Sequence, residues 1–205
     1  MVVGRWDRTP FGTFSDVMVE DRSGHRVLLA PNEVVADLLQ QTYRFDEVVI
    51  GEVSVATETA PGTGSTDPAR GGRDHSEEHW RLSAPGLEAD LQIGSRTPVG
   101  WLLRAVPRPL ATSPRWLTVI NPAAAVIMNG VRTRGSVGPG RTEFYGAYDV
   151  RSLVAAKGRW RDADLGDLAP VEPPVRFGFG STPTAPTVTS LITTIRTDAV
   201  EPTAR

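Results

Sequence analysis

Glu143 and Tyr145 are the residues of this sequence whose types and spacing best suit proton transfer. They are two positions apart in TEFYGAY, so on a β-strand their side chains project from one face, with Phe144 on the other. If burial raises the pKa of the carboxyl group, the two can act as a general acid and base. A position on the surface, without chemistry, is the alternative.

Asp16 is the third candidate for proton transfer. The segment TFSDVMVE alternates, which places Asp16 on the same face of a predicted strand as Phe14, Met18 and Glu20. If Phe14 and Met18 face the interior, the Asp16 carboxyl group lies in or near a cavity. The alternative is a solvated hairpin end that groups Asp16 with Glu20 and His25.

A second set of residues suits ligand binding. Arg132, Arg134 and Arg141 lie within ten residues of one another among several glycines, and guanidinium groups beside exposed amides suit a carboxylate or phosphate. The segment carries neither a Walker sequence nor GxGxxG. Trp101 and Trp116 of the preceding apolar segment complete the candidate ligand-binding set. A flexible hairpin loop without a ligand is the alternative for the arginines.

Other reaction chemistries find little support in the sequence. There is no cysteine, which excludes disulfides, thiolate nucleophiles and cysteine metal sites. His75 and His79 are spaced as in HExxH, but Ser76 stands where that motif needs glutamate. No GxSxG occurs either. We therefore expect no metal site and no cofactor.

The hydrophobic pattern predicts a mainly β fold with minor α-structure, a curved antiparallel sheet or β-barrel with a short helical insert. Regular alternation of strand and helix is missing, which disfavours a parallel doubly wound sheet. The predicted strands are 13–20, 25–31, 43–57, 79–83, 87–93, 142–148, 151–160, 174–180 and 187–197, with a helix from Pro31 to about Gln41.

The predicted domain covers residues 1–198, followed by a disordered tail at 199–205. Residues 59–78 lack large apolar side chains and predict a mobile loop. Residues 97–130 predict three short helices, each opened by a capping residue and a proline, the third at Asn121 and Pro122. These helices are apolar on several sides, so they either plug a barrel or meet a ligand, a partner or a membrane surface.

The composition limits the kinds of binding partner that we expect. The formal net charge is −2 and charges of both signs are interspersed, so we expect no nucleic-acid partner and no membrane-surface patch. No window approaches the roughly 18 apolar residues of a membrane-spanning helix. The segment MVVGRWDRTPFG lacks the features of a signal peptide, which together with the missing cysteines predicts a cytoplasmic location.

Two segments carry resemblances. GTFSDVMVEDRSGHRVLLAP and GVRTRGSVGPGRTEFYG resemble an uncharacterised actinobacterial protein family, and the small strands around an apolar interior are similar to lipocalin-like barrels. TPFGTFSDVMV resembles a strand motif of the acetoacetate-decarboxylase-like superfamily. That resemblance implies a lysine whose pKa is lowered by a neighbouring cation. The single lysine, Lys157, lies near a turn in VAAKGRWRD, a different context that argues against decarboxylation.

Three functional hypotheses follow. The first is binding of a small, mostly apolar ligand with an acidic group inside a β-barrel, because an apolar insert adjoins the arginine-rich loop. The second is an isomerase, cyclase or lyase acting on such a ligand, which requires at least two of the proton-transfer candidates to converge. The third is a homo-oligomer without a small ligand, with Trp101, Trp116 and Ile127 as interface anchors.

Overall fold

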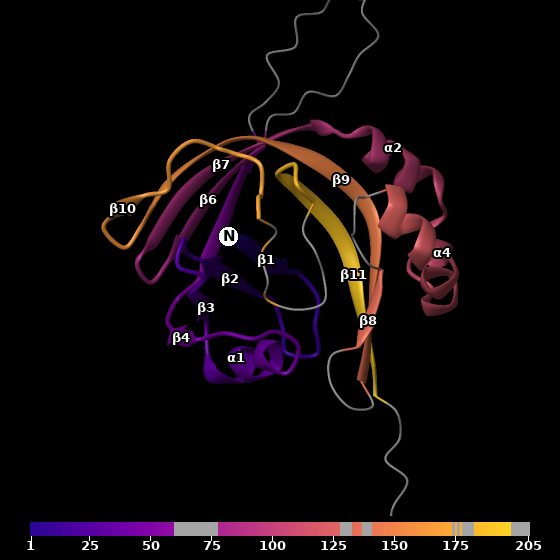
Figure 1. Ribbon diagram of the computed structural model, residues 1–205, viewed down its shortest axis with the longest axis horizontal. Helices are drawn as coiled ribbons and strands as arrows, with labels where there is room; N and C mark the ends of the chain where they lie inside the picture. The colour runs from indigo at the N-terminus through magenta and orange to yellow at the C-terminus, as the bar shows by residue number, and fades with distance from the viewer. Residues whose placement is uncertain are drawn as a thin grey trace, which may run out of the picture.

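The structure is a computed structural model that describes residues 1–59, 78–127, 133–136, 141–173, 175, 177 and 183–197. In this part of the chain, two β-sheets and four helices form the fold (Figure 1). The predicted mainly β class is confirmed, and neither sheet closes into a barrel within the described residues. Residues 60–77 of the predicted loop, most of the predicted strand 174–180 and the tail lie outside the described residues.

The first sheet has the order β1-β2-β3-β4. Its strands are β1 (Val2–Trp6), β2 (Phe14–Glu20), β3 (Arg26–Ala30) and β4 (Glu47–Ile50). The predicted hairpin of β2 and β3 is confirmed, and β4 returns parallel to β3 after the helix α1 (Glu33–Gln40). Asn32 caps α1 by accepting a hydrogen bond from the Val35 N–H at 3.0 Å. The helix therefore begins two residues after Pro31, which was predicted to open it.

The predicted long strand 43–57 is wrong, because this segment contributes one strand to each sheet. β4 ends at Ile50, and β5 (Ser54–Thr59) pairs with β6 in the second sheet. A β-carbon on Gly51 would lie 2.6 Å from Cγ of Pro85, so glycine permits the close approach where the chain changes sheets.

The second sheet has the order β10-β9-β7-β6-β5, and β8 and β11 also pair with β9. Its remaining strands are β6 (Glu78–Ala84), β7 (Leu87–Arg96), β8 (Arg134–Ser136), β9 (Arg141–Trp160), β10 (Ala163–Asp164) and β11 (Thr187–Thr197). The predicted hairpin around Gly86 is confirmed, with φ of +72° at that glycine. The two strands predicted between 142 and 160 are one, β9, which curves as an arch (Figure 1).

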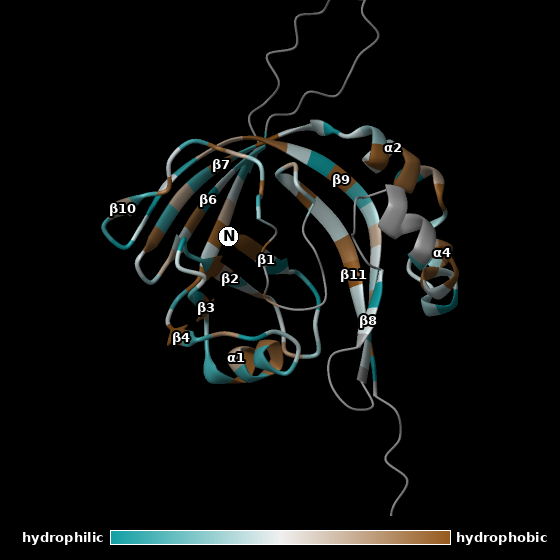
Figure 2. Ribbon diagram, viewed as in Figure 1, coloured by the Kyte–Doolittle hydropathy of each residue, from teal (hydrophilic) through white to brown (hydrophobic). Residues whose placement is uncertain are grey.

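The main core lies between the two sheets. Strands β6 and β7 alternate hydrophobic and hydrophilic residues, visible as brown and teal bands in Figure 2. Their apolar faces pack against the buried valines and leucines of β2 and β3. The buried residues of this core are Val17, Val19, Val27, Leu29, Val53, Leu82, Leu87, Ala89, Leu91 and Ile93.

A second cluster lies on the opposite face of the first sheet, under α1. It contains Phe14, Met18, Leu28, Ala30, Val35, Ala36, Leu39 and Phe177, with Tyr43 packed at its edge. The first sheet is thus covered on both faces, which explains why β2 and β3 are buried almost throughout.

The helical insert consists of α2 (Pro98–Ala105), α3 (Arg108–Ala111) and α4 (Pro114–Ile127). The predicted break at Asn121 and Pro122 is wrong, because α4 runs through both residues. Oδ1 of Asn121 accepts hydrogen bonds from the N–H groups of Thr133 and Arg134, at 2.9 and 3.2 Å, instead of capping a new helix. Pro122 removes one backbone donor, which a long helix tolerates at a cost.

The three helices lie on the outer, convex side of β9, away from the first sheet (Figure 1). Gly100 and Gly146 allow this packing: a β-carbon on Gly100 would lie 2.2 Å from the Val150 carbonyl oxygen, and one on Gly146 would lie 2.8 Å from Cα of Thr112. The helices are therefore a covering layer and do not plug an interior. None of the described helices has the length and apolar character needed to cross a membrane.

Candidate active site

Asp16 is fully buried, with 0% of its surface exposed, on the face of β2 that points to α1. Its Oδ1 accepts a hydrogen bond from Nε1 of Trp6 at 2.7 Å. Gly4 pairs with Asp16 across β1 and β2, and a β-carbon there would lie 2.3 Å from Oδ1. The sheet thus leaves room for a carboxyl group because the opposing residue has no side chain.

Burial raises the pKa of Asp16 from its ordinary 3.8 to about 6, against a smaller lowering by the Trp6 hydrogen bond. The second oxygen, Oδ2, is buried and has no hydrogen-bond partner in the described part of the chain. Buried polar atoms are almost always paired, so an unpaired oxygen here indicates a group that a proton or ligand completes.

Glu143, Tyr145 and Tyr43 form a hydrogen-bonded chain from two distant parts of the sequence. The Tyr145 hydroxyl donates to Oε2 of Glu143 at 3.1 Å, and the two tyrosine oxygens are 2.5 Å apart. Glu143 has only 3% of its surface exposed. Both candidates lie on one face of β9, called here the inner face, as their spacing predicted.

The two tyrosine hydroxyls stay protonated at neutral pH. Burial, followed by the charge of Glu143, raises the pKa of Tyr43. Burial is also the largest cause that raises the pKa of Tyr145, with further contributions from Tyr43 and Glu143. The charge of Asp16 also raises the pKa of Tyr43, which places Asp16 in the same electrostatic environment. The group therefore combines two neutral hydroxyls with two buried carboxyl groups.

Thr193 adds a second unpaired polar atom to this region. It pairs with Tyr145 across β11 and β9, so the two side chains lie on the same face of the sheet. Its Oγ1 is buried and has no hydrogen-bond partner among the described residues. We call Asp16, Tyr43, Glu143, Tyr145 and Thr193 the polar cluster.

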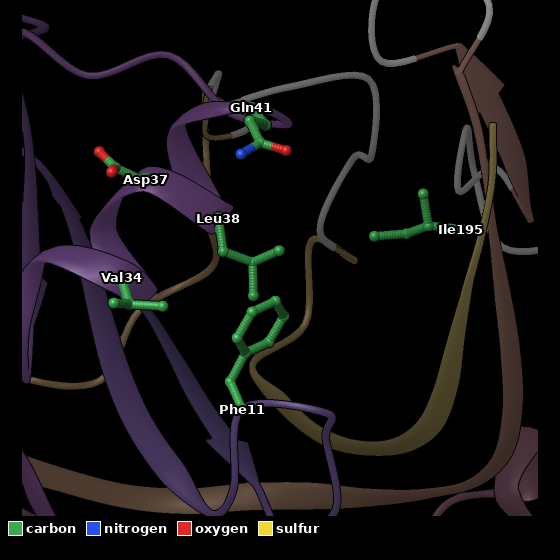
Figure 3. Close-up of a pocket in the computed structure, with 6 residues that line it drawn as sticks. All are labelled: Phe11, Val34, Asp37, Leu38, Gln41 and Ile195. Carbon is green, nitrogen blue, oxygen red and sulfur yellow. The ribbon is translucent and has the colours of Figure 1, made fainter.

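A cleft of about 410 Å³ lies next to the polar cluster, between α1 and β11. Figure 3 shows Leu38 of α1 and Ile195 of β11 pointing toward each other, with Phe11 below, while the Asp37 carboxylate turns away from β11. The lining residues are Phe11, Val34, Asp37, Leu38, Gln41 and Ile195. Ile195 pairs with Glu143 across the sheet, so this wall of the cleft adjoins the cluster.

The predicted ligand-binding residues do not line this cleft. Trp101 is 62% exposed on α2, on the outer side of β9, and Trp116 is half-buried on α4. The Arg134 guanidinium lies 5.8 Å from the ring of Phe144, on the outer face. Arg141 begins β9 and pairs through its backbone with Thr197, and Arg132 lies outside the described residues. The structure thus separates the predicted arginine and tryptophan set from the proton-transfer candidates.

The remaining sequence candidates lie elsewhere. His25 contacts Glu47 at 3.1 Å at the hairpin end, away from Asp16. Lys157 is exposed on β9 opposite Asp90. Residue 79 is an exposed histidine on β6, and residue 75 lies outside the described residues. Within the part of the chain that is described, no three potential metal-ligating side chains gather.

Tyr43 and Thr193 were not predicted as site residues. Tyr43 follows α1, and its N–H donates to the Leu39 carbonyl oxygen at 2.8 Å, which turns its ring toward the cluster under the helix. Only the β11 register places Thr193 beside Tyr145. Neither position carries a motif, so only the tertiary arrangement identifies it.

Comparison of the chain with protein-family models, with curated proteins and with solved structures found no match. The function must therefore be inferred from the residues of the cleft and the polar cluster.

Proposed function

We propose that the protein binds a small, mostly apolar molecule in the cleft between α1 and β11, with the polar end of that molecule directed at the polar cluster. The observation that carries the proposal is a mostly apolar cleft of about 410 Å³, in which the lining residue Ile195 of β11 pairs directly with the buried Glu143. Cavities of this size, apolar with a few converging polar groups, are typical of small-molecule sites.

The chemistry of the cluster limits the polar end of the ligand. Each tyrosine hydroxyl is neutral and has a single proton, and the Tyr145 proton, which Glu143 accepts, can turn to a ligand oxygen instead. Burial raises the pKa of Asp16 to about 6, so its carboxyl group is neutral below that pH. Such groups donate hydrogen bonds to a carbonyl or carboxyl oxygen. These donors can bind the acidic group of the ligand that the sequence predicts, without any contact to the arginines.

A pair of substitutions on β11 tests binding. Ile195→Trp fills the cleft, and Ile192→Trp makes the same change on the opposite face of the same strand. We expect apolar carboxylic acids or their methyl esters to raise the melting temperature of the wild type and of Ile192→Trp, and not that of Ile195→Trp. Thermal shift against a panel of matched acid and ester pairs measures this. Equal shifts for both variants, or none for the wild type, contradict the proposal.

A second function, proton transfer on the bound molecule, is favoured by the contact of Tyr145 with Glu143. In this reaction the Glu143 carboxylate removes a proton from the carbon next to a carbonyl group, and the Tyr145 hydroxyl turns its one proton from Glu143 to the oxygen that becomes negative, while Tyr43 donates to the Tyr145 oxygen. The proton returns to the same or a neighbouring carbon, so the step is an isomerisation and needs no oxidant. This belongs to the isomerase and lyase class proposed from sequence.

Hydrogen exchange in D2O tests this second function. We expect the protein to accelerate exchange at the carbon next to the carbonyl group in a panel of apolar ketones, followed by proton NMR. Glu143→Gln should lower the rate by at least about a hundredfold, and Tyr145→Phe by about tenfold to a hundredfold. Tyr148→Phe is the matched control, since Tyr148 lies on β9 under Arg108. Equal loss in Tyr148→Phe, or exchange that survives Glu143→Gln, would overturn the assignment.

A further inference from the structure

The charges of this chain are unevenly distributed, contrary to the expectation from composition. Residues 91–142 contain seven arginines and no aspartate or glutamate. The rest of the chain carries 15 basic and all 24 acidic residues. The net charge of −2 is therefore the sum of a strongly basic segment, residues 91–142, and an acidic remainder. The helices α2, α3 and α4 all belong to this basic segment.

The helices of this segment turn their small or buried residues to β9 and several large apolar residues to solvent. Gly100, Ala111 and Leu117 are buried against the sheet. The large side chains are on the other side, where Val119 is 73% exposed. Among the side chains that the structure describes in α2 to α4, the large exposed apolar ones are Trp101, Leu102, Leu110 and Val119. Hydrophobic stretches of α2 are visible in brown outside the arch in Figure 2.

Arginines are interspersed with these apolar residues on the same helices. Arg104, Arg108 and Arg115 are all exposed. Arg104 lies 3.8 Å from Asp149, an acid that already binds Arg96 through two hydrogen bonds of 2.7 and 2.9 Å. The outer surface of α2 to α4 therefore combines exposed tryptophan and aliphatic side chains with an excess of positive charge.

We propose that this outer surface docks onto an anionic lipid bilayer. Helices that lie in a membrane interface combine arginines with Trp and Leu side chains in this manner, because the cations pair with lipid headgroups while the apolar side chains enter the acyl boundary. A second copy of the chain fits less well, since a twofold interface would bring the same arginines together without acidic partners from these helices.

Co-sedimentation of the full chain with two kinds of vesicle tests the proposal. One kind contains phosphatidylcholine alone, and in the other phosphatidylglycerol makes up about a third of the lipid. We expect binding to the anionic vesicles only. Replacing Arg104 and Arg115 together by serine should weaken it about twenty-fivefold, at roughly fivefold per arginine. Replacing Trp101 and Val119 together by serine should weaken it at least about tenfold.

Matched control variants replace Arg22 and Arg159 together by serine, or Ile50 alone. These residues are exposed and lie outside the basic segment, and we expect both variants to bind like the wild type. Circular dichroism verifies that each variant is folded. Equal binding to both vesicle types, no binding, or an equal loss in the controls overturns the proposal. A dimer in light scattering that the Trp101 and Val119 variant dissociates, without vesicle binding, assigns the surface to a second copy.

Discussion

Replacing Asp16 by asparagine is expected to raise the free energy of unfolding at pH 8 by about 3 kcal/mol. The native structure holds the pKa of this carboxyl group at about 6, against 3.8 ordinarily. Each unit of difference corresponds to about 1.4 kcal/mol. Asparagine retains Oδ1 as the acceptor for Trp6 and removes the burial of a charge, so the gain applies where the wild-type group is ionised.

The sign of the effect fixes its pH dependence. Below pH 3.8 both folded and unfolded chains hold the proton, and Asp16 contributes no penalty. Between pH 3.8 and about 6 the unfolded chain has released the proton that the native protein keeps, so stability falls as pH rises through the native pKa. Above pH 6 the full penalty applies.

Urea unfolding at pH 4.5 and pH 8 measures this difference for wild type and Asp16→Asn. The advantage of the variant should be small at the lower pH and largest at the higher one. Asp90→Asn, which changes an exposed aspartate on β7, is the control and should leave the pH dependence unaltered. If the free energy of unfolding depends on pH in the same way for the wild type and for Asp16→Asn, then ionisation of Asp16 does not destabilise the native protein, and the prediction is wrong.

Leu29→Ala is expected to lower the free energy of unfolding by about 3 kcal/mol, because it leaves a cavity in the core between the sheets. Leu29 has 0% of its surface exposed and lies between Val17 of β2 and Val49 of β4 in the first sheet. The surrounding strands are held by ladders on both sides, so they cannot collapse fully into the space.

The same chemical change at Leu102, which is 59% exposed on α2, is the matched control. It should alter the free energy of unfolding by no more than about 0.5 kcal/mol. Urea unfolding of both variants at one pH gives the comparison. Equal losses at the two positions would mean that the outer side of α2 is packed, which would also remove the exposed surface on which lipid docking depends.

Sequence patterns predicted the parts of the fold that depend on local alternation. The hydrophobic pattern indicates one or two buried faces for each of the strands β2, β3, β6 and β7. Turn residues such as Pro85 and Gly86 mark where these strands end. The break between β4 and β5 was missed because it depends on the contact of Gly51 with Pro85, 34 residues away. A continuous run of β-branched residues gives no sign of a change of sheet.

The sequence predicted those site residues that local alternation places on one face, and missed those that only tertiary contacts bring to the site. The spacing of Glu143 and Tyr145 put them on one face, and the alternation around Asp16 put it with Phe14 and Met18, as the structure has them. Nothing in the sequence pairs Tyr43 with Tyr145, which are 102 residues apart. Arg134 reaches the outer face because its partner in the β8 register is Phe144, and register is a tertiary property.

The short run from Glu143 to Gly146 separates the two surfaces proposed for this protein. Glu143 and Tyr145 lie on the inner face of β9, the face that Ile195 of the cleft wall shares with Glu143, while Phe144 and Gly146 face the arginines and helices of the outer side. Gaining or losing one residue here would exchange the two sets, and would push a tyrosine ring into the space that Gly146 leaves for Thr112. Both surfaces therefore require this segment to keep its exact length, because the length decides which face each side chain occupies.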